Sequence, residues 1–110
     1  MNRKEMIERI ERAVNGCYNY FKEKVMVDKE EIYCEEMALM YNLRKYLQYI
    51  TYEEKGISDK MLKVFINNIG TFIDDLLDIY WKNDLGNSYG DITIYLKEIY
   101  VERVEWFLII

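Results

Sequence analysis

Apolar residues recur at steps of three and four along most of this chain of 110 residues. Such spacing places them on one face of an α-helix, and that face must be buried against a neighbouring helix. Proline, which is common in turns and on edge strands, is absent. The pattern predicts an all-α fold of long helices with few loops, in a single helical domain over residues 1–110.

Two helices are predicted in the first half of the chain. The first covers residues 2–25. Its apolar face consists of Met6, Ile7, Ile10, Val14, Cys17, Tyr18, Phe21 and Val25. The second covers residues 28–52, and Asp28 is expected to cap it, because Glu31 follows three residues later as in a capping box. The apolar face of this second helix consists of Ile32, Tyr33, Leu39, Met40, Leu43, Tyr46, Leu47 and Ile50.

The third predicted helix has the clearest start. Ser58 is a favoured N-cap residue, and Ile57 before it is placed to pack on Leu62 as a hydrophobic staple. This helix is expected to run without a break to Gly86, which suits the C′ position. We expect all but one of five central side chains to be buried. They are Phe65, Ile66, Ile69, Phe72 and Ile73.

The fourth segment, residues 92–107, is less regular. Asp91 suits its N-cap, but the β-branched residues at its start are equally consistent with a strand. We favour a helix, because a single strand would have no partner. The segment carries two apolar stripes. The first consists of Ile92, Leu96, Ile99, Tyr100 and Phe107, and the second of Ile94, Val101, Val104 and Leu108.

Four amphipathic helices with short connections predict an antiparallel four-helix bundle whose fourth segment is irregular. One apolar stripe is enough for a helix of such a bundle, so the second stripe of residues 92–107 is in excess. Residues 106–110 are also apolar. Monomers seldom expose large apolar patches. We therefore expect a second copy or a partner to cover this surface, unless the terminus folds back across the bundle.

Tyrosine is abundant, with eleven residues. Most tyrosines lie on or beside the apolar faces and are expected to fill the core. Three others lie on the opposite side of the second helix, where they either bind a partner or make a secondary packing contact. Tyrosine is enriched at binding hot spots, because it offers a large contact area at low entropic cost. The candidate binding residues are Tyr41, Tyr49, Tyr52, Val101, Val104, Trp106 and Leu108.

Histidine is absent, which excludes Ser-His-Asp and Cys-His catalytic groups and histidine-ligated metal sites. Asp74, Asp75 and Asp78 lie within about one helical turn, yet they fall on a polar face, as solvent-exposed acids do. Glu5 and Glu8 have a spacing found in helical metal-dependent hydrolases, but such pairs arise often by chance among 20 acidic residues. No metal site, cofactor or enzymatic activity is predicted.

The formal net charge of −5 argues against general binding to nucleic acid and suits a basic partner. The sequence contains no signal peptide and no stretch of about 20 apolar residues that would span a membrane. With only Cys17 and Cys34 and no export signal, we expect a cytoplasmic protein with free thiols.

These features favour a non-catalytic protein that occludes a macromolecular partner, either another protein or a second copy of this chain. Inhibitors, immunity or antitoxin-like proteins and phage anti-defence proteins are of this kind. The alternative is a protein that sequesters a small ligand or nucleotide, with bases stacked on tyrosines and phosphates held by Arg3, Arg9 and Arg12. A helical hydrolase that binds metal through carboxylates is a third hypothesis.

Overall fold

The computed structural model describes residues 1–52 and 56–109, with only the backbone described for residues 105–109. These residues form five α-helices and a 3₁₀ turn, so the prediction of an all-α fold is confirmed. The helices are α1 (Arg3–Met26), α2 (Cys34–Tyr52), α3 (Asp59–Asn67), α4 (Ile69–Lys82) and α5 (Tyr89–Ile109).

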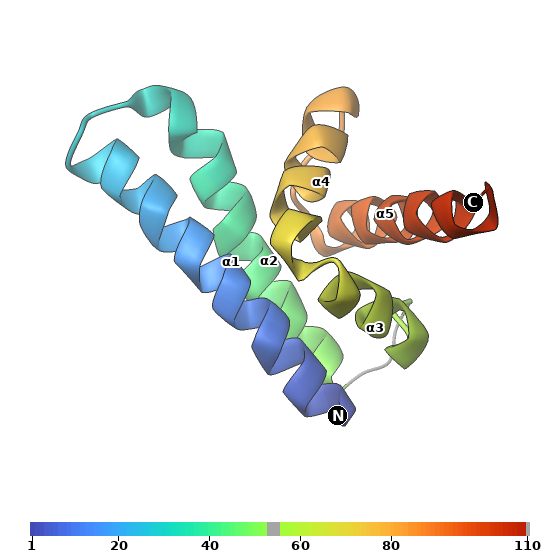
Figure 1. Cartoon of the computed structure of the whole chain (residues 1–110). Coiled ribbons are helices and arrows are strands. Elements are labelled where there is room, and N and C mark those ends of the chain that lie inside the picture. Colours follow the sequence, from blue (N-terminus) through green and yellow to red (C-terminus); the bar gives the residue numbers. More distant parts are fainter. Residues whose placement is uncertain (53–55, 110) are drawn as a thin grey trace.

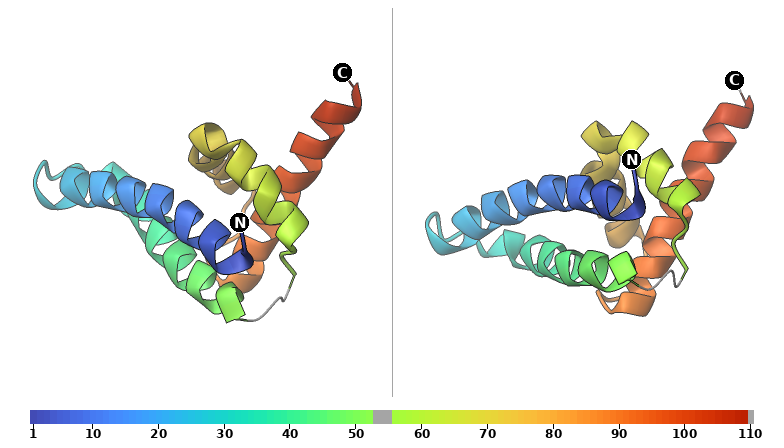
Figure 2. Two further views of the ribbon diagram at one scale, coloured as in Figure 1. Left: turned by 60° about the horizontal axis from the view of Figure 1, so that its bottom comes forward. Right: turned by 90° about the horizontal axis from the view of Figure 1, so that it is seen from below.

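The long antiparallel hairpin of α1 and α2 forms one side of the molecule, and the other three helices pack against it (Figure 1). The predicted four-helix bundle is not confirmed, because there are five helices and α3, α4 and α5 run at differing angles to the hairpin. The C-terminal half of α5 projects away from the rest (Figure 2). None of the helices, as far as they are described, is long and apolar enough to cross a membrane.

The first helix agrees with its prediction. Asn2 caps α1, and its side-chain oxygen accepts a hydrogen bond from the Glu5 amide at 2.8 Å. Most of the predicted apolar face is buried, while Cys17, Tyr18 and Val25 are only partly covered. The helix ends at Met26, one residue beyond the prediction.

The turn between α1 and α2 differs from the prediction that Asp28 caps the second helix. Lys29 has a left-handed backbone with φ of 58°, which no helix continues through. The Asp28 carboxylate lies 3.6 Å from the amino group of Lys24. The chain then makes a 3₁₀ turn over Glu31–Tyr33 before α2 begins, and Ile32 in this turn is 76% exposed. The predictions that Asp28 is the cap and that Ile32 joins the apolar face are therefore wrong.

The predicted third helix is broken at Asn68, which has φ −119° and ψ 31° and separates α3 from α4. Its side-chain nitrogen donates a hydrogen bond to the Val64 carbonyl at 2.8 Å, which satisfies one of the free acceptors at the end of α3. Asn67 before it and Gly70 after it are also poor helix formers. By contrast, the predicted N-cap is confirmed, since Ser58 accepts a hydrogen bond from the Met61 amide.

The break at Asn68 changes which side chains are buried. Phe65 and Phe72, on either side of it, approach to 5.2 Å between ring centroids. Together with Ile73 they are buried, whereas Ile66 and Ile69 are only partly covered. Three of the five central side chains are thus buried, and the prediction of four is wrong because it assumed one straight helix.

The helix α4 ends at Lys82 and not at Gly86 as predicted. The backbone and side-chain nitrogens of Asn83 both donate to the Ile79 carbonyl, at 3.1 and 2.8 Å, and so close the helix. The Gly86 carbonyl accepts a hydrogen bond from the hydroxyl of Tyr95 on α5. Gly86 therefore lies in the connection to α5, where a buried tyrosine anchors it.

The fourth segment is a helix over its described length. Ser88 and Asp91 cap its start reciprocally, with the Ser88 hydroxyl accepting from the Asp91 amide at 3.1 Å and the Asp91 carboxylate accepting from the Ser88 amide at 3.3 Å. The cap is thus Ser88, and Asp91 occupies the third helical position instead of the predicted N-cap. The reciprocal hydrogen bonds explain why the β-branched residues that follow are helical.

The core lies between the five helices: α2, α3 and α4 pack against α1, and α5 packs against α2, α3 and α4. The buried face of α5 consists of Ile92, Tyr95, Leu96 and Ile99. The hydroxyl of Tyr46 on α2 lies 2.7 Å from that of Thr93 on α5 and forms a hydrogen bond with it. Arg3 contacts Asp59 at 2.8 Å and also donates to the carbonyls of Ile50 and Ile57, which joins α1 to the start of α3.

Two substitutions on α4 test the effect of the break. Leu76→Ala, at a fully buried side chain, should lower the free energy of unfolding by about 2–5 kcal/mol. Ile69→Ala, at a partly covered side chain, should lower it by only about 1 kcal/mol. Urea denaturation of both variants measures the difference. Equal losses above 2 kcal/mol would mean that Ile69 is core and the helix is unbroken.

Candidate binding surfaces

The tyrosines predicted to bind lie on the outer side of α2, and all three are more than one-third exposed. The exposed fractions of Tyr41, Tyr49 and Tyr52 are 44%, 38% and 83%. The amino group of Lys45 lies 4.5 Å from the centre of the Tyr41 ring. Hydrogen bonding and charge interaction with the Tyr41 hydroxyl raise the pKa of Lys45. This lysine therefore stays positively charged at neutral pH, beside the Tyr41 ring.

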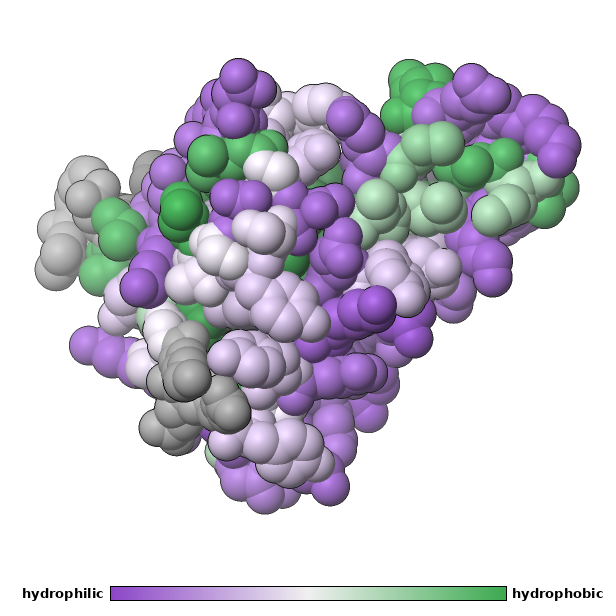
Figure 3. Space-filling model, turned by 180° about the vertical axis from the view of Figure 1, so that it is seen from behind, coloured by the Kyte–Doolittle hydropathy of each residue, from purple (hydrophilic) through white to green (hydrophobic). Residues whose placement is uncertain are grey.

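A fourth tyrosine joins this surface from another helix. Tyr89, the first residue of α5, is 39% exposed, and its ring centroid lies 5.4 Å from that of Tyr49 and 5.6 Å from that of Tyr46. The prediction missed Tyr89, because this residue lies between the third and fourth predicted helices. We call Tyr41, Tyr49, Tyr52 and Tyr89 the tyrosine surface. Figure 3 views the side on which α2 lies in front of α1 and shows side chains of intermediate hydropathy gathered across it.

Tyr52 borders a shallow cavity of about 130 Å³ between α1 and α2. The cavity is also lined by Lys4, Glu8, Glu11, Gln48 and Thr51. Burial, and next the neighbouring Glu8, raises the pKa of Glu11, while Arg44 opposes the shift. The charged lining residues are one lysine and two glutamates, so the cavity presents little net charge to a ligand.

The second predicted stripe of α5 is separate from the tyrosine surface. Ile94 and Val101 are 45% and 49% exposed and line a shallow groove of about 510 Å³, while Val104 is half-buried. Trp106 and Leu108 have side chains outside the described residues. At 1.5 Å per residue, Val101 lies about 18 Å along α5 from Tyr89. The structure thus divides the predicted candidates between two surfaces.

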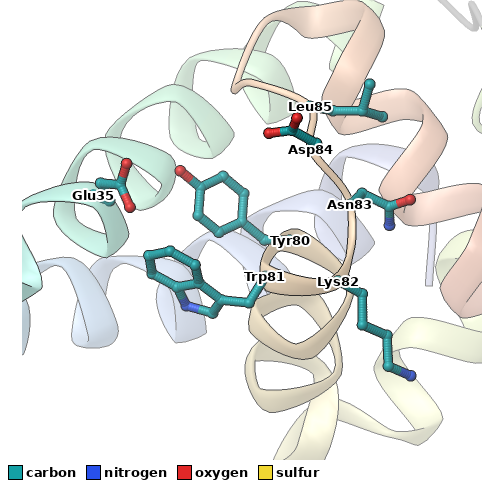
Figure 4. Close-up of a pocket in the computed structure, with 7 residues that line it drawn as sticks. All are labelled: Glu35, Tyr80, Trp81, Lys82, Asn83, Asp84 and Leu85. Atoms are coloured by element: carbon teal, nitrogen blue, oxygen red, sulfur yellow. The ribbon is translucent and has the colours of Figure 1, made fainter.

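A third feature, which the prediction missed, is a pocket where the end of α4 meets the start of α2 (Figure 4). It has a volume of about 230 Å³. Its lining residues are Glu35, Tyr80, Trp81, Lys82, Asn83, Asp84 and Leu85. Trp81 is 55% exposed, and its ring centroid lies 5.0 Å from that of Tyr80 in an edge-to-face arrangement.

The pocket is electronegative near Tyr80. Burial raises the pKa of the Tyr80 hydroxyl, and the carboxylates of Glu35 and Glu36 raise it further. One carboxylate oxygen of Glu36 is buried and has no hydrogen-bond partner among the described residues. No signal within one helix could reveal this pocket, because it depends on the angle between α4 and α2.

The aspartates of α4 are divided between different environments. Asp75 is paired with Arg103 on α5, which also donates to the Thr71 hydroxyl at 2.9 Å. Asp74 and Asp78 are exposed. Within the described residues, there is no group of three acidic or cysteine side chains that could hold a metal ion.

Comparison with protein-family models, curated proteins and solved structures found no match to this chain.

The two cysteines are free and differ in environment. Cys34 is exposed at the start of α2, whereas Cys17 is partly covered on α1. Burial, and next the charge of Asp74, raises the pKa of the Cys17 thiol, which lowers its thiolate fraction near neutral pH.

We predict that iodoacetamide alkylates Cys34 faster than Cys17 in the folded protein at about pH 8. The exposed thiol is accessible, while the covered thiol is both less accessible and less ionised. Mass spectrometry of the two cysteine-containing peptides over time measures the rates, with urea-unfolded protein as the control. Equal rates in the folded protein, or faster reaction at Cys17, would contradict these positions.

Proposed function

We propose that this protein is a non-catalytic binding protein of the cytoplasm, which occludes a macromolecular partner through the tyrosine surface. The supporting observation is the exposure of four tyrosine rings from α2 and α5 on one side of the molecule. Buried aromatic anchors are found at the centres of protein interfaces. Inhibitors, immunity or antitoxin-like proteins and anti-defence proteins of phages act by such occlusion.

The packing of these rings supports this role. Tyr49 is held by Tyr89, and Tyr89 also contacts the buried Tyr46, so two of the four rings are positioned before binding. A pre-positioned side chain loses less conformational entropy when it enters an interface. The net charge of −5 favours a partner with a basic surface. We therefore propose a basic protein as the partner.

The groove on α5 supports self-association as a second interaction. Ile94 and Val101 are spaced seven residues apart on the same side of the helix, with Lys97 and Glu98 between them. In an antiparallel pair of α5 helices centred between these charged residues, Ile94 would face Val101 of the second copy and Lys97 would face Glu98. The surface is thus complementary to itself, as a two-fold symmetric interface requires.

Substitution of exposed tyrosines tests the tyrosine surface. Tyr52→Ser should change the free energy of unfolding by no more than about 0.5 kcal/mol, because the ring is 83% exposed. The protein can be immobilised and used to isolate binding proteins from a cell extract. We expect the double variant Tyr49→Ser/Tyr52→Ser to bind its partner at least roughly 30-fold more weakly, as loss of a hot spot implies.

The matched control for this experiment is Tyr20→Ser, since Tyr20 is 53% exposed on α1 and lies outside the tyrosine surface. The proposal requires one protein to be retained by the unaltered chain and by the control, to be lost by the double variant, and to lose its own activity when bound. A protein retained equally by all three chains would show that the tyrosine surface is not the site.

Val101→Lys tests self-association. The side chain is half exposed, so the folded monomer should lose no more than about 0.5 kcal/mol. We expect the unaltered chain to sediment as a dimer and the variant as a monomer, because two lysines would face the apolar residues of the partner copy. If the unaltered chain is a monomer at all concentrations tested, the self-association proposal is wrong, although the tyrosine surface is unaffected.

The other two hypotheses can be tested against this proposal by thermal denaturation. A ligand bound only by the native state raises the melting temperature. We expect nucleotides and divalent cations to leave it unchanged. A rise with a nucleotide, lost in a Tyr49→Ser variant, would favour the nucleotide-binding alternative, and a rise with a divalent cation would favour the hydrolase.

A further inference from the structure

The pocket between α4 and α2 has a chemistry of its own. Two aromatic rings, Tyr80 and Trp81, extend from the end of α4 toward Glu35 at the start of α2 (Figure 4). The carboxylate of Asp84 stands on the connection above them. The pocket thus combines π-faces with carboxylates from two separate parts of the chain, an arrangement that attracts a cation.

Within the described part of the chain, no cation neutralises these acids. Among the described residues, neither Glu35 nor Asp84 forms an ion pair. Lys82 lines the pocket, but its side chain extends away from Glu35, Tyr80 and Trp81 (Figure 4). A positive charge that enters from outside would therefore meet carboxylates without partners.

The backbone adds to the negative potential. The helix α4 has 14 residues and ends at Lys82, which lines the pocket. The carbonyl groups of its last turn, which have no partner within the helix, therefore lie at the pocket. Only the Ile79 carbonyl receives the Asn83 donors. The negative end of the helix dipole favours cations at this position. The buried oxygen of Glu36 without a partner contributes further negative charge beside Tyr80.

We propose that this pocket binds a guanidinium group, presented as an arginine side chain of a polypeptide. A guanidinium is planar and weakly hydrated, so it can stack on the Trp81 indole while its nitrogens donate to the carboxylates of Glu35 and Asp84. The volume of about 230 Å³ corresponds to roughly eight waters, which is room for a guanidinium and part of its alkyl chain. The proposal does not depend on the tyrosine surface.

The test is an NMR titration of the 110-residue chain with N-acetylarginine methylamide, in which the indole signal of Trp81 is identified by comparison with Trp81→Phe. We expect saturable shifts of the Trp81 indole and of the amides of residues 35 and 80–85. The uncharged citrulline analogue, which has the same shape, should produce no saturable shift at the same concentrations.

Three variants give the decisive comparison. Glu35→Gln and Asp84→Asn change exposed carboxylates and should each weaken binding by about tenfold, as loss of a charge-assisted hydrogen bond implies. Glu23→Gln, which removes the same charge from an exposed position of α1 outside the pocket, should leave affinity unchanged. Melting temperatures check that all three remain folded. If the arginine and citrulline probes give equal shifts, or if Glu23→Gln weakens binding as much as Glu35→Gln, the proposal is wrong.

A further titration distinguishes the source of the guanidinium. A Gly-Arg-Gly peptide should bind more tightly than guanidinium chloride at equal ionic strength, because the alkyl chain also contacts Trp81 and Leu85. A stronger effect of free guanidinium would overturn the assignment to a polypeptide side chain. Loss of arginine binding would leave the tyrosine-surface experiments unaffected, so the two proposals fail separately.

Discussion

The arrangement of the second half of the chain depends on Asn68, where α3 ends with a hydrogen bond from the Asn68 side chain to the Val64 carbonyl and α4 leaves in a new direction. A straight helix over the same residues would continue in the direction of α3. The break instead turns α4 so that its last turn reaches the start of α2, where Tyr80 and Trp81 meet Glu35. The shape of the molecule and its electronegative pocket both follow from this change of direction.

The helical periodicity of the sequence was sufficient to predict an all-α fold and the extent of α1, because that helix is long and its apolar positions repeat regularly. Periodicity could not reveal the break at Asn68, since apolar residues continue at helical spacing on both sides of it. The signal was present in the Asn67-Asn68-Ile69-Gly70 sequence, where poor helix formers cluster. Likewise, the spacing of Ser88 and Asp91 already matched a capping box.

For the candidate surfaces too, sequence spacing predicted the residues on one helix but not the contacts between helices. Tyr41, Tyr49 and Tyr52 could be placed on the outer side of α2 because a helix converts sequence spacing directly into a face. The contribution of Tyr89, and the separation of Val101 from these rings, depend on how α5 crosses α2, which no local pattern encodes. The pre-positioned tyrosine rings are the observation on which we propose a binding role for this protein.

The most direct test of the helix break at Asn68 is the contact between the rings of Phe65 and Phe72. In a straight helix, the backbones of two residues seven positions apart are separated by about 10.5 Å along the axis, which keeps their side chains two turns apart. Here the ring centroids of Phe65 and Phe72 lie only 5.2 Å apart. We expect nuclear Overhauser effects between the two rings and a Cα chemical shift at Asn68 that departs from helical values. Absence of ring contacts, together with helical shifts through residues 59–82, would contradict the break and the pocket that depends on it.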